Sequence, residues 1–379
     1  MPARCSKGGW EQGIPTILSA ATPSLSEIDP PLSRDVASIQ DIARQARVSI
    51  GTVDRVLHRR GRVSESTRRR VQRIVTELGY KPNIYARNLS LAKMFRFVVV
   101  MPKLDQDSGY WRIPAEGIER AHRQLGAAKV RVLYCHFDRY SDSSFEKAFA
   151  RALRSEPDGI LLAPILQEWA RQLVKTIPST IPYAYFDSIL PDSTPLTTIG
   201  QDPYQSGILA AHLMARMTRV GGTVALVKVT PADYHITERL RGFRTAMDAI
   251  PSIRVAEYDA DSHGGDSAFG VVAGKIRDEN SDLVGVFVSN AWTHPFAREF
   301  NKRGSTPRVC VIGYDLVAEN RKCLEAGQID FLISQRPIMQ GFEGISALYR
   351  NVVLRDKVNK SVMVPLDIIT KDNVRYYLD

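Results

Sequence analysis

The sequence predicts two folded parts, a small all-α head and a larger α/β domain built of two lobes. The chain has 379 residues, a length that allows two or three domains of ordinary size. Residues 38–80 carry apolar side chains in short blocks at helical spacing. From Phe95 onward, short apolar runs alternate with amphipathic helical stretches, a pattern typical of parallel sheets covered by helices.

The N-terminal residues 1–37 are rich in Pro, Ser, Gly and Thr and show no sustained periodicity. We predict a disordered tail, which need not belong to the native protein if translation starts further in. The helical spacing of apolar residues in the head predicts three helices, with Ser49 and Ser64 as N-caps of the second and third. The tight turn at 47–49 joins the first two, which predicts a helix-turn-helix. In that motif the second helix enters the major groove of DNA.

In the larger domain, β-branched or apolar runs predict strands at 97–101, 130–135, 159–163, 182–186, 223–229, 283–288 and 308–313. Amphipathic stretches predict helices between them, including 114–125, 143–155, 203–217 and 237–249. This part of the chain is long for a single sheet of this kind, so we expect two lobes.

Composition and charge narrow the function. At 44% hydrophobic and 24% charged residues, the chain is neither fibrous nor disordered as a whole. Residues 38–93 hold 13 Lys and Arg against 4 Asp and Glu, a net charge of +9, whereas the rest of the chain carries only +1. This asymmetry favours a nucleic-acid-binding head on a near-neutral body.

Several classes of protein are disfavoured. No stretch of 18 apolar residues predicts a membrane span, and the first 35 residues lack the pattern of a secretory signal. The four cysteines form no Cys-x-x-Cys pair, which argues against a disulfide scaffold or structural zinc and fits a reducing compartment. There is no Walker loop, His-Glu-x-x-His or Gly-x-Ser-x-Gly motif. We therefore expect a cytoplasmic protein that is not an enzyme and holds no cofactor or metal.

Three stretches of the head carry a specific pattern: IQDIARQARVSIGTVDRVLHRR at 39–60, VSESTRRRV at 63–71 and ELGYKPNIYARNLS at 77–90. They resemble the lactose-repressor family of bacterial transcription regulators. The body resembles the two-lobed domain that this family shares with periplasmic sugar-binding proteins. The resemblance implies a DNA-binding domain at 38–81, a hinge helix or linker at 82–93, and an effector-binding and dimerisation domain at 94–379.

The resemblance also implies which residues contact DNA: Ser49, Ile50, Gly51, Thr52, Asp54, Arg55, Arg62, Thr67, Asn83, Ala86 and Leu89. Arg55 would face base edges, where a guanidinium can bond guanine in bidentate fashion. Hydroxyls such as that of Thr52 would bind phosphate, and Leu89 would wedge into the minor groove. Asp54 stands where most family members have Ser. Its carboxylate would either accept a hydrogen bond from a cytosine or form an ion pair with an arginine of the head.

A pocket for a polyol needs planar bidentate groups for the hydroxyls and an aromatic plate for the apolar face. Both kinds of residue follow predicted strands or match family motifs, and they make up the candidate ligand-binding set: Tyr110, Trp111, Asp187, Arg239, Asn290, Asp315 and Gln335. Each has a structural alternative. Asp187 and Asp315 could cap the helices that follow, Trp111 could fill the core, and Arg239 could be a solvated helix charge.

The pocket differs from that of sugar-binding relatives. Residues 163–164 are Ala-Pro where Asn is frequent, Ser188 stands where some relatives have Arg, and Ala291 where Asp is common. These differences argue against naming a specific sugar. Trp292 and His294 follow in a loop and could either line the pocket or play a structural part.

Together these features predict a homodimeric transcription regulator that binds a pseudo-palindromic operator and responds to a small effector, a sugar or related polyol. The main alternative is a solute-binding receptor for carbohydrate uptake without a DNA role, which would need a signal peptide. A sugar-modifying enzyme on a similar fold is a third hypothesis, and the sequence lacks a catalytic signature for it.

Overall fold

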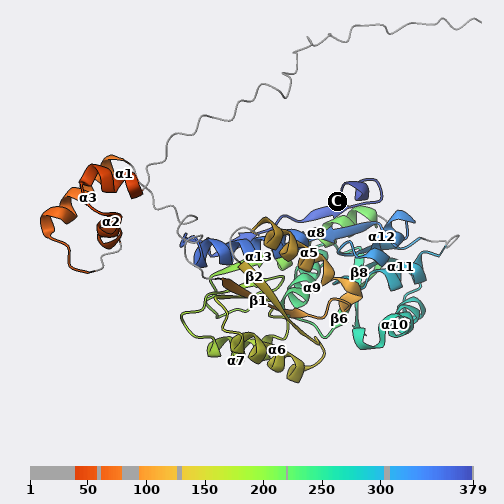
Figure 1. Cartoon of the computed structure of the whole chain (residues 1–379). Helices are drawn as coiled ribbons and strands as arrows, with labels where there is room; N and C mark the ends of the chain where they lie inside the picture. The colour runs from red at the N-terminus through yellow and green to blue at the C-terminus, as the bar shows by residue number, and fades with distance from the viewer. Residues whose placement is uncertain are drawn as a thin grey trace, which may run out of the picture. The chain divides into compact units, whose positions relative to one another are not determined.

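The structure is a computed structural model that describes residues 39–57, 61–78, 94–125, 130–218, 221–302 and 308–377. The chain divides into two compact units, Met1–Asn83 and Ile84–Asp379 (Figure 1). The predicted tail at 1–37 and the predicted hinge at 82–93 lie outside the described residues. Within the described residues, none of the helices has the length and apolar character needed to cross a membrane.

The first unit contains three helices, α1 (Ile39–Ala46), α2 (Ile50–Leu57) and α3 (Glu65–Glu77). Their apolar faces meet in one small core: Ile42, Ala43, Ala46, Val53, Val56, Val71 and Ile74 are buried. The predicted caps are confirmed. The hydroxyl of Ser49 accepts from the backbone N–H of Thr52 at 3.2 Å, and Ser64 caps α3 through the N–H of Thr67.

The first lobe of the second unit is a six-stranded sheet in the order β11-β5-β4-β3-β1-β2, all parallel. Its strands are β1 (Phe95–Pro102), β2 (Val130–Phe137), β3 (Gly159–Leu162), β4 (Tyr183–Phe186), β5 (Thr197–Gly200) and β11 (Ser361–Met363). One face is covered by α5 (Arg112–Gln124) and α13 (Pro337–Val352), the other by α6 (Asp142–Arg154) and α7 (Gln167–Leu173).

The second lobe is a six-stranded sheet in the order β12-β10-β9-β8-β6-β7, parallel except for β12. Its strands are β6 (Gly222–Thr230), β7 (Ile253–Asp261), β8 (Leu283–Val288), β9 (Cys310–Tyr314), β10 (Phe331–Ser334) and β12 (Asp367–Ile369). Its helices are α8 (Pro203–Met217) and α9 (Tyr234–Met247) on one face, and α10 (Gly265–Glu279), α11 (His294–Phe300) and α12 (Ala318–Glu325) on the other.

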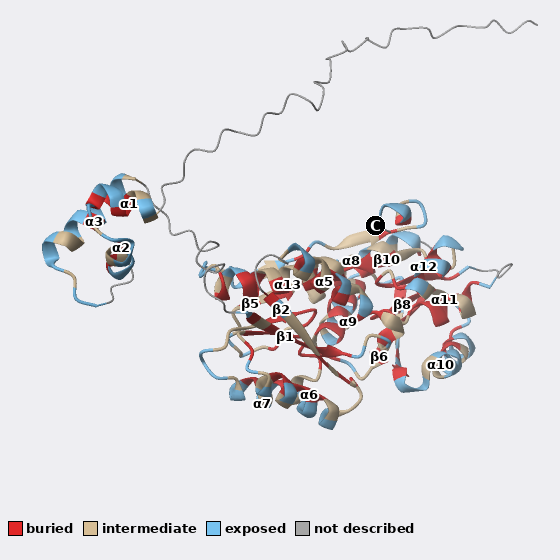
Figure 2. Ribbon diagram, viewed as in Figure 1, coloured by how far each residue is buried: buried red, intermediate tan, exposed pale blue. Residues whose placement is uncertain are grey.

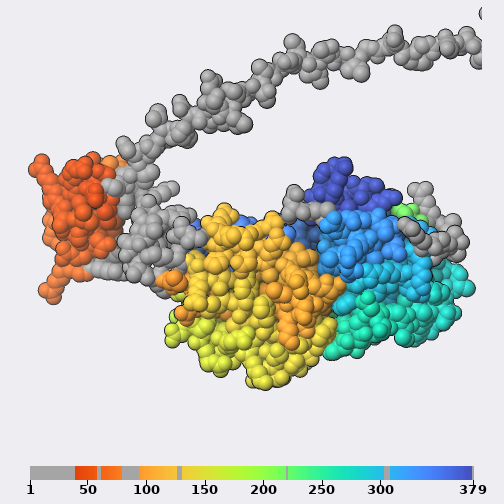
Figure 3. All heavy atoms as spheres, turned by 45° about the vertical axis from the view of Figure 1, so that its right-hand side comes forward, coloured from red at the N-terminus to blue at the C-terminus, as the bar shows by residue number. Residues whose placement is uncertain are grey.

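The chain passes between the lobes three times, after β5, after β10 and after β11. These crossings bring the carboxyl ends of both sheets to the same cleft. Figure 2 shows the strands of both sheets buried beneath helices whose outer faces are exposed. Figure 3 shows the part of the first lobe that precedes the first crossing (orange to yellow-green) lying against the second lobe (green to blue).

The helices α8 and α9 pack unusually closely. A Cβ on Gly207 would lie 2.0 Å from the carbonyl oxygen of Arg239, and one on Gly242 would lie 2.0 Å from that of Tyr204. Only glycine permits this approach. The close packing fixes the position of α9, and therefore of the side chains it presents to the cleft.

The predicted fold class is confirmed, as are all seven predicted strands and four predicted helices of the larger domain. The prediction missed five strands: β5, β7, β10, β11 and β12. Four of these are short, with three or four residues each. The fifth, β7, is an edge strand with exposed acidic side chains such as Glu257 and Asp259, so it lacks a continuous apolar run.

Candidate functional site

A buried polar cavity lies where the carboxyl ends of the two sheets meet, the usual place for ligands in open parallel sheets. It is lined by Asp107, Tyr110, Trp111, Arg139, Asp187, Asp233, His235, Ile236, Arg239, Asn290, Ala291, Asp315 and Gln335. All seven residues predicted to bind ligand are among them. The cavity is small, with about 20 Å³ of free volume, enough for about one water molecule.

Aromatic side chains form one wall. Trp111 is 1% exposed, and its ring meets those of Tyr110 and Phe186 edge to face, with centroids 5.1 and 6.3 Å away. Its indole N–H donates to Asp107 Oδ2 at 2.7 Å. Trp111 therefore belongs to the core of the first lobe and lines the cavity as well.

A chain of hydrogen bonds links the two lobes across the cavity. The hydroxyl of Tyr110 donates to Asp187 Oδ1. The amide Nε2 of Gln335 donates to the Tyr110 hydroxyl and to Asp315 Oδ2, both at 3.0 Å. Gln335 lies at the crossing between β10 and α13, so it joins an aspartate of each lobe to one interlobe segment.

Arg239 is buried on α9, with 1% of its surface exposed. Its Nη1 donates to the carbonyl oxygen of Ser289 and its Nη2 to Gln335 Oε1, both at 3.0 Å. The guanidinium also lies 3.8 Å from the ring centroid of Tyr314, a favourable cation–π geometry. The alternative that Arg239 is a solvated helix charge is therefore wrong.

Asp187 and Asp315 each follow a strand directly, and neither caps a helix. The side chain that caps α8 is Asp202, and α12 begins after Val317 without a side-chain cap. Both aspartates have left-handed backbones, with φ of 68° and 60°, a conformation that Asp and Asn tolerate better than most residues. The structure thus turns both carboxylates into the cavity.

Burial shifts the protonation of these groups. It raises the pKa of Asp187, and it raises the pKa of Asp315 to about 7, where the nearby Arg239 opposes the shift and the charge of Asp187 adds to it. Burial also lowers the pKa of His235 to about 3, helped by the positive charge of Arg239. His235 is therefore neutral at physiological pH.

Four charged or titratable lining residues were not predicted. Arg139 pairs with Asp107 and donates from Nη2 to the carbonyl oxygen of Pro231 in the second lobe at 2.9 Å. His235 Nδ1 lies 3.1 Å from Asp233 Oδ1, but the two groups are not aligned for a hydrogen bond. Two signals could have identified them. Arg139 follows the end of a predicted strand by a few residues, and His235 precedes the predicted Arg239 by one helical turn.

Five polar atoms of the lining are buried without a hydrogen-bond partner among the described residues: Arg139 Nε, Asp187 Oδ2, His235 Nδ1, Arg239 Nε and Asp315 Oδ1. Unpaired buried polar atoms are costly, so such a cluster is typical of a binding site. It combines carboxylate acceptors with guanidinium donors, the groups that a polyol requires.

Trp292 and His294 do not line the cavity. The Trp292 ring packs against Phe269, with centroids 5.0 Å apart. The His294 ring lies with Nδ1 3.1 Å from Asn320 Oδ1. Both side chains have structural contacts within the second lobe. Across the described part of the chain, no cluster of three or more His, Cys, Asp and Glu side chains is arranged to hold a metal ion.

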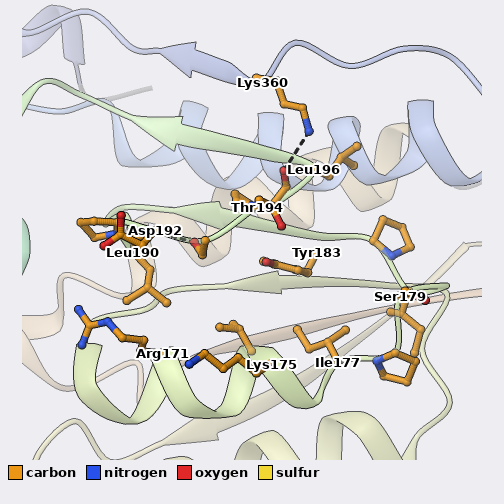
Figure 4. A pocket seen from close by; sticks show the side chains of 17 residues that line it. Arg171, Lys175, Ile177, Ser179, Tyr183, Leu190, Asp192, Thr194, Leu196 and Lys360 are labelled. Atoms are coloured by element: carbon orange, nitrogen blue, oxygen red, sulfur yellow. Dashed lines mark hydrogen bonds between the residues drawn. The ribbon is translucent and has the colours of Figure 1, made fainter.

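A second pocket, of about 480 Å³, lies in the first lobe between α7 and the segment that connects β4 to β5 (Figure 4). Its basic side chains, Arg171, Lys175 and Lys360, are exposed. Its lining includes Tyr183 and Leu196, at the amino ends of β4 and β5, and shares no residue with the buried cavity. It lacks the convergent buried polar groups found there.

In the first unit, most of the predicted DNA contacts are at the surface. The exposed residues are Ser49, Ile50, Gly51, Asp54, Arg55 and Arg62, and the half-buried ones are Thr52 and Thr67. The guanidinium of Arg55 donates to the carbonyl oxygen of Gly51 at 3.1 Å and to Thr52 Oγ1 at 3.4 Å, which holds it along α2. The predicted contacts Asn83, Ala86 and Leu89 lie outside the described residues.

Comparisons with known sequences agree with this two-part organisation. The model of the lacI family of bacterial regulatory proteins matches residues 38–83, and that of the periplasmic binding protein domain matches residues 97–354. The HTH-type transcriptional regulator DegA of Bacillus subtilis (strain 168) is 29% identical over 215 residues, which are 56% of this chain and 60% of DegA. Catabolite control protein A of Priestia megaterium is 27% identical over 260 residues, 66% of this chain and 73% of that protein.

Solved structures show the same fold. A putative LacI transcriptional regulator from Bacteroides fragilis matches with a TM-score of 0.69 and 25% identity, covering 75% of this chain and all of that one. The glucose-galactose binding protein GanP from Geobacillus stearothermophilus matches with a TM-score of 0.66 and 22% identity, covering 74% and 99%. Residues 97–354, more than half of the chain, belong to the family of periplasmic binding protein domains, and they follow a head at residues 38–83 that matches the lacI family of bacterial regulatory proteins.

Proposed function

We propose that the protein is a sequence-specific DNA-binding transcription regulator whose operator affinity is modulated by a small effector, a sugar or related polyol. One observation carries the proposal: the chain joins a lacI-type helical head to a domain with a buried polar cavity between two lobes. The head favours this function over that of a solute-binding receptor for carbohydrate uptake, because transport requires no DNA-binding unit.

In this proposal, residues 38–81 bind DNA, 82–93 form the hinge and 94–379 bind the effector and dimerise. A homodimer places two heads on a pseudo-palindromic operator in the cytoplasm. The protein catalyses no reaction and needs no cofactor. The lining of the cavity supports binding rather than catalysis, since its aspartates and arginines are held by hydrogen bonds to protein groups.

The effector acts by linkage. A ligand bound between the lobes favours the arrangement in which both lobes contact it, and it can change DNA affinity only by its preference for that arrangement. Contacts between the lobes already exist beside the cavity, from Arg139 to Pro231 and from the Tyr140 hydroxyl to Ser262 Oγ at 2.9 Å. Coupling of this kind typically amounts to about 1–3 kcal/mol.

On the DNA side, α2 presents Ile50, Gly51 and Arg55 to base edges, while Ser49, Thr52 and Thr67 bind phosphates. The exposure of the first turn of α2 supports this assignment. Asp54 is exposed on the same helix, and its choice between a base and an arginine of the head stays a prediction. Arg62, and Asn83, Ala86 and Leu89 of the hinge, complete the proposed contacts.

The test selects operator sequences from random DNA with the full chain. The same selection is then repeated with the Arg55→Ala variant. Loss of a bidentate contact to guanine should cost about 1–3 kcal/mol at the cognate site and relax the preference at one position. Arg73→Ala is the matched control, because this arginine is equally basic but pairs with Glu77 on α3. If Arg55→Ala keeps the full sequence preference, the base-reading role is wrong. If no DNA sequence is enriched by the wild-type chain, the proposed function itself fails.

A further inference from the structure

We propose that Gln340, which lies outside the cavity, is a positioning residue that orients the carboxamide of Gln335 between the two lobes. The inference rests on the proposed function, because Gln335 lines the site given to the effector. Gln340 is fully buried on α13 and is not a lining residue. Three features support this role: a closed ring of hydrogen bonds, the partners of Gln335 in the second lobe, and the tight packing of α13.

Four residues form a closed ring of hydrogen bonds. Gln340 Oε1 accepts from the backbone N–H of Asp187, and Gln340 Nε2 donates to the carbonyl oxygen of Gln335, both at 2.8 Å. The side chain of Gln335 continues the ring, because its Nε2 donates to the Tyr110 hydroxyl at 3.0 Å, which in turn donates to Asp187 Oδ1. Gln340 is the member of this ring that does not line the cavity, so it can act on a ligand only through the other three.

The carboxamide of Gln335 also holds two residues of the second lobe. Its Oε1 accepts from Arg239 Nη2, and its Nε2 donates to Asp315 Oδ2, both at 3.0 Å. Only one orientation of the carboxamide satisfies both partners, since the reverse would turn its N–H groups toward the guanidinium and its oxygen toward the carboxylate. Gln340 fixes the backbone from which this carboxamide extends, and therefore the place where Arg239 and Asp315 meet the first lobe.

The helix that carries Gln340 is held firmly in the first lobe. A Cβ on Gly341, the next residue of α13, would lie 2.1 Å from the carbonyl oxygen of Pro114 in α5, so the two helices touch through their backbones. Gln335 precedes this helix and is followed by Arg336, whose left-handed backbone, with φ of 49°, turns the chain into α13. Gln340 thus joins a tightly packed helix to the segment that crosses between the lobes.

The pKa of Asp315 reports the orientation of Gln335 without any ligand. Burial raises this pKa to about 7, Arg239 lowers it and the charge of Asp187 raises it, while hydrogen bonds from Gln335 lower it. Tyr110 also faces Asp315 and stays neutral, because burial raises its own pKa well above 10. If the carboxamide of Gln335 loses its place, the carboxylate of Asp315 loses a hydrogen-bond donor, and the pKa of Asp315 rises further.

The experiment measures this pKa in the full chain by ¹³C NMR of labelled aspartate carboxyl groups, with the signal of Asp315 assigned from its absence in Asp315→Asn. Gln340→Met removes both hydrogen bonds of the side chain at similar volume. Gln340→Asn is the milder change, because it keeps the carboxamide but is too short to reach both partners. We expect each variant to raise the pKa of Asp315 by about one pH unit, the effect of a lost hydrogen bond to a charged group.

Two further variants separate positioning from general destabilisation. Ile345→Val, buried on the same helix, is the matched control and should lower stability while leaving the pKa of Asp315 unchanged. Gln335→Met removes the carboxamide itself and should raise that pKa. If Gln340 acts through Gln335, adding Gln340→Met to Gln335→Met should change the pKa little further, because the carboxamide that Gln340 positions is already gone.

Three outcomes would overturn the inference: an unchanged pKa of Asp315 in the variants of Gln340, an equal rise in Ile345→Val, or additive effects in the double variant. The measurement needs neither DNA nor an effector, so its failure is distinguishable from failure of the proposed function. An unchanged pKa beside normal operator selection contradicts the inference alone. Absence of an enriched operator sequence contradicts the proposed function and leaves the role of Gln340 to be judged from the pKa values.

Discussion

At the scale of single residues, Asp315 shows how a binding site can lower stability. It is 2% exposed, its backbone is left-handed, and one carboxylate oxygen has no partner. Burial raises its pKa to about 7, whereas an unfolded chain gives an aspartate a pKa of about 4. Above pH 4 the unfolded state loses this proton while the folded state keeps it, so the stability of the free protein falls as the pH rises toward 7.

We therefore predict that Asp315→Asn stabilises the ligand-free protein at pH 8, by an amount on the order of 1–4 kcal/mol, because asparagine carries no charge to desolvate. At pH 4 the carboxyl is protonated in the folded state and about half protonated in the unfolded state, so most of the gain should vanish. The same variant should bind the effector weakly. Denaturant unfolding at the two pH values measures the effect, and an equal gain at both would show that the charge of Asp315 is not the cause.

The residues of the cavity could be predicted to the extent that they follow strands or recognisable motifs. Tyr110, Asp187 and Asp315 follow predicted strands, and the structure places all of them in the lining. Arg139 and His235 were missed although each lies near a predicted strand end or a predicted site residue, because such a position is a weak signal and the contacts that place them in the lining form only when the two lobes come together. Only the fold brings Arg139 of one lobe to Pro231 of the other.

At the scale of elements, the contact between α8 and α9 positions Arg239. We predict that Gly242→Ala destabilises the protein by about 1–3 kcal/mol, because the added methyl would overlap the backbone of Tyr204 and push the helices apart. Effector affinity should fall as well, since Arg239 would move with α9. Denaturant unfolding and calorimetry measure the two effects.

Gly270→Ala on α10 is the matched control for that substitution. A Cβ there meets no atom within 4 Å, so it should raise stability by about 0.5–1 kcal/mol through helix propensity alone. Equal effects of the two substitutions would contradict the role given to the α8–α9 contact.

Helices and strands could be predicted from the sequence where their side chains are clearly either buried in the core or exposed to solvent. The central strands β1, β6 and β8 are almost wholly buried and read as apolar runs. Strands such as β11 and β12 have three residues each. Such short strands exist because a neighbour pairs with them, so their own sequences carry little signal.

At the scale of the whole molecule, we propose that effector binding changes how closely the two lobes approach each other. The Tyr140 hydroxyl bonds to Ser262 across the cleft. We predict that Tyr140→Phe weakens effector binding about fivefold, because one hydrogen bond that favours closure is worth about 1 kcal/mol. Tyr134→Phe is the control, since its hydroxyl bonds to Glu119 within the first lobe at 2.6 Å. Calorimetry that shows the same loss in both variants would reject a role in closure.

The central claim is that a ligand in the interlobe cavity changes the affinity of the head for DNA. The most direct test is fluorescence anisotropy with the selected operator, in the wild-type chain and in Asp315→Asn, with and without a sugar or polyol that calorimetry shows to bind the chain. We predict that the sugar changes operator affinity by about 5–150-fold in the wild type. The variant should bind the operator normally and should not respond at the same sugar concentration. Unchanged operator affinity at saturating sugar, or an equal response in both proteins, would contradict the claim.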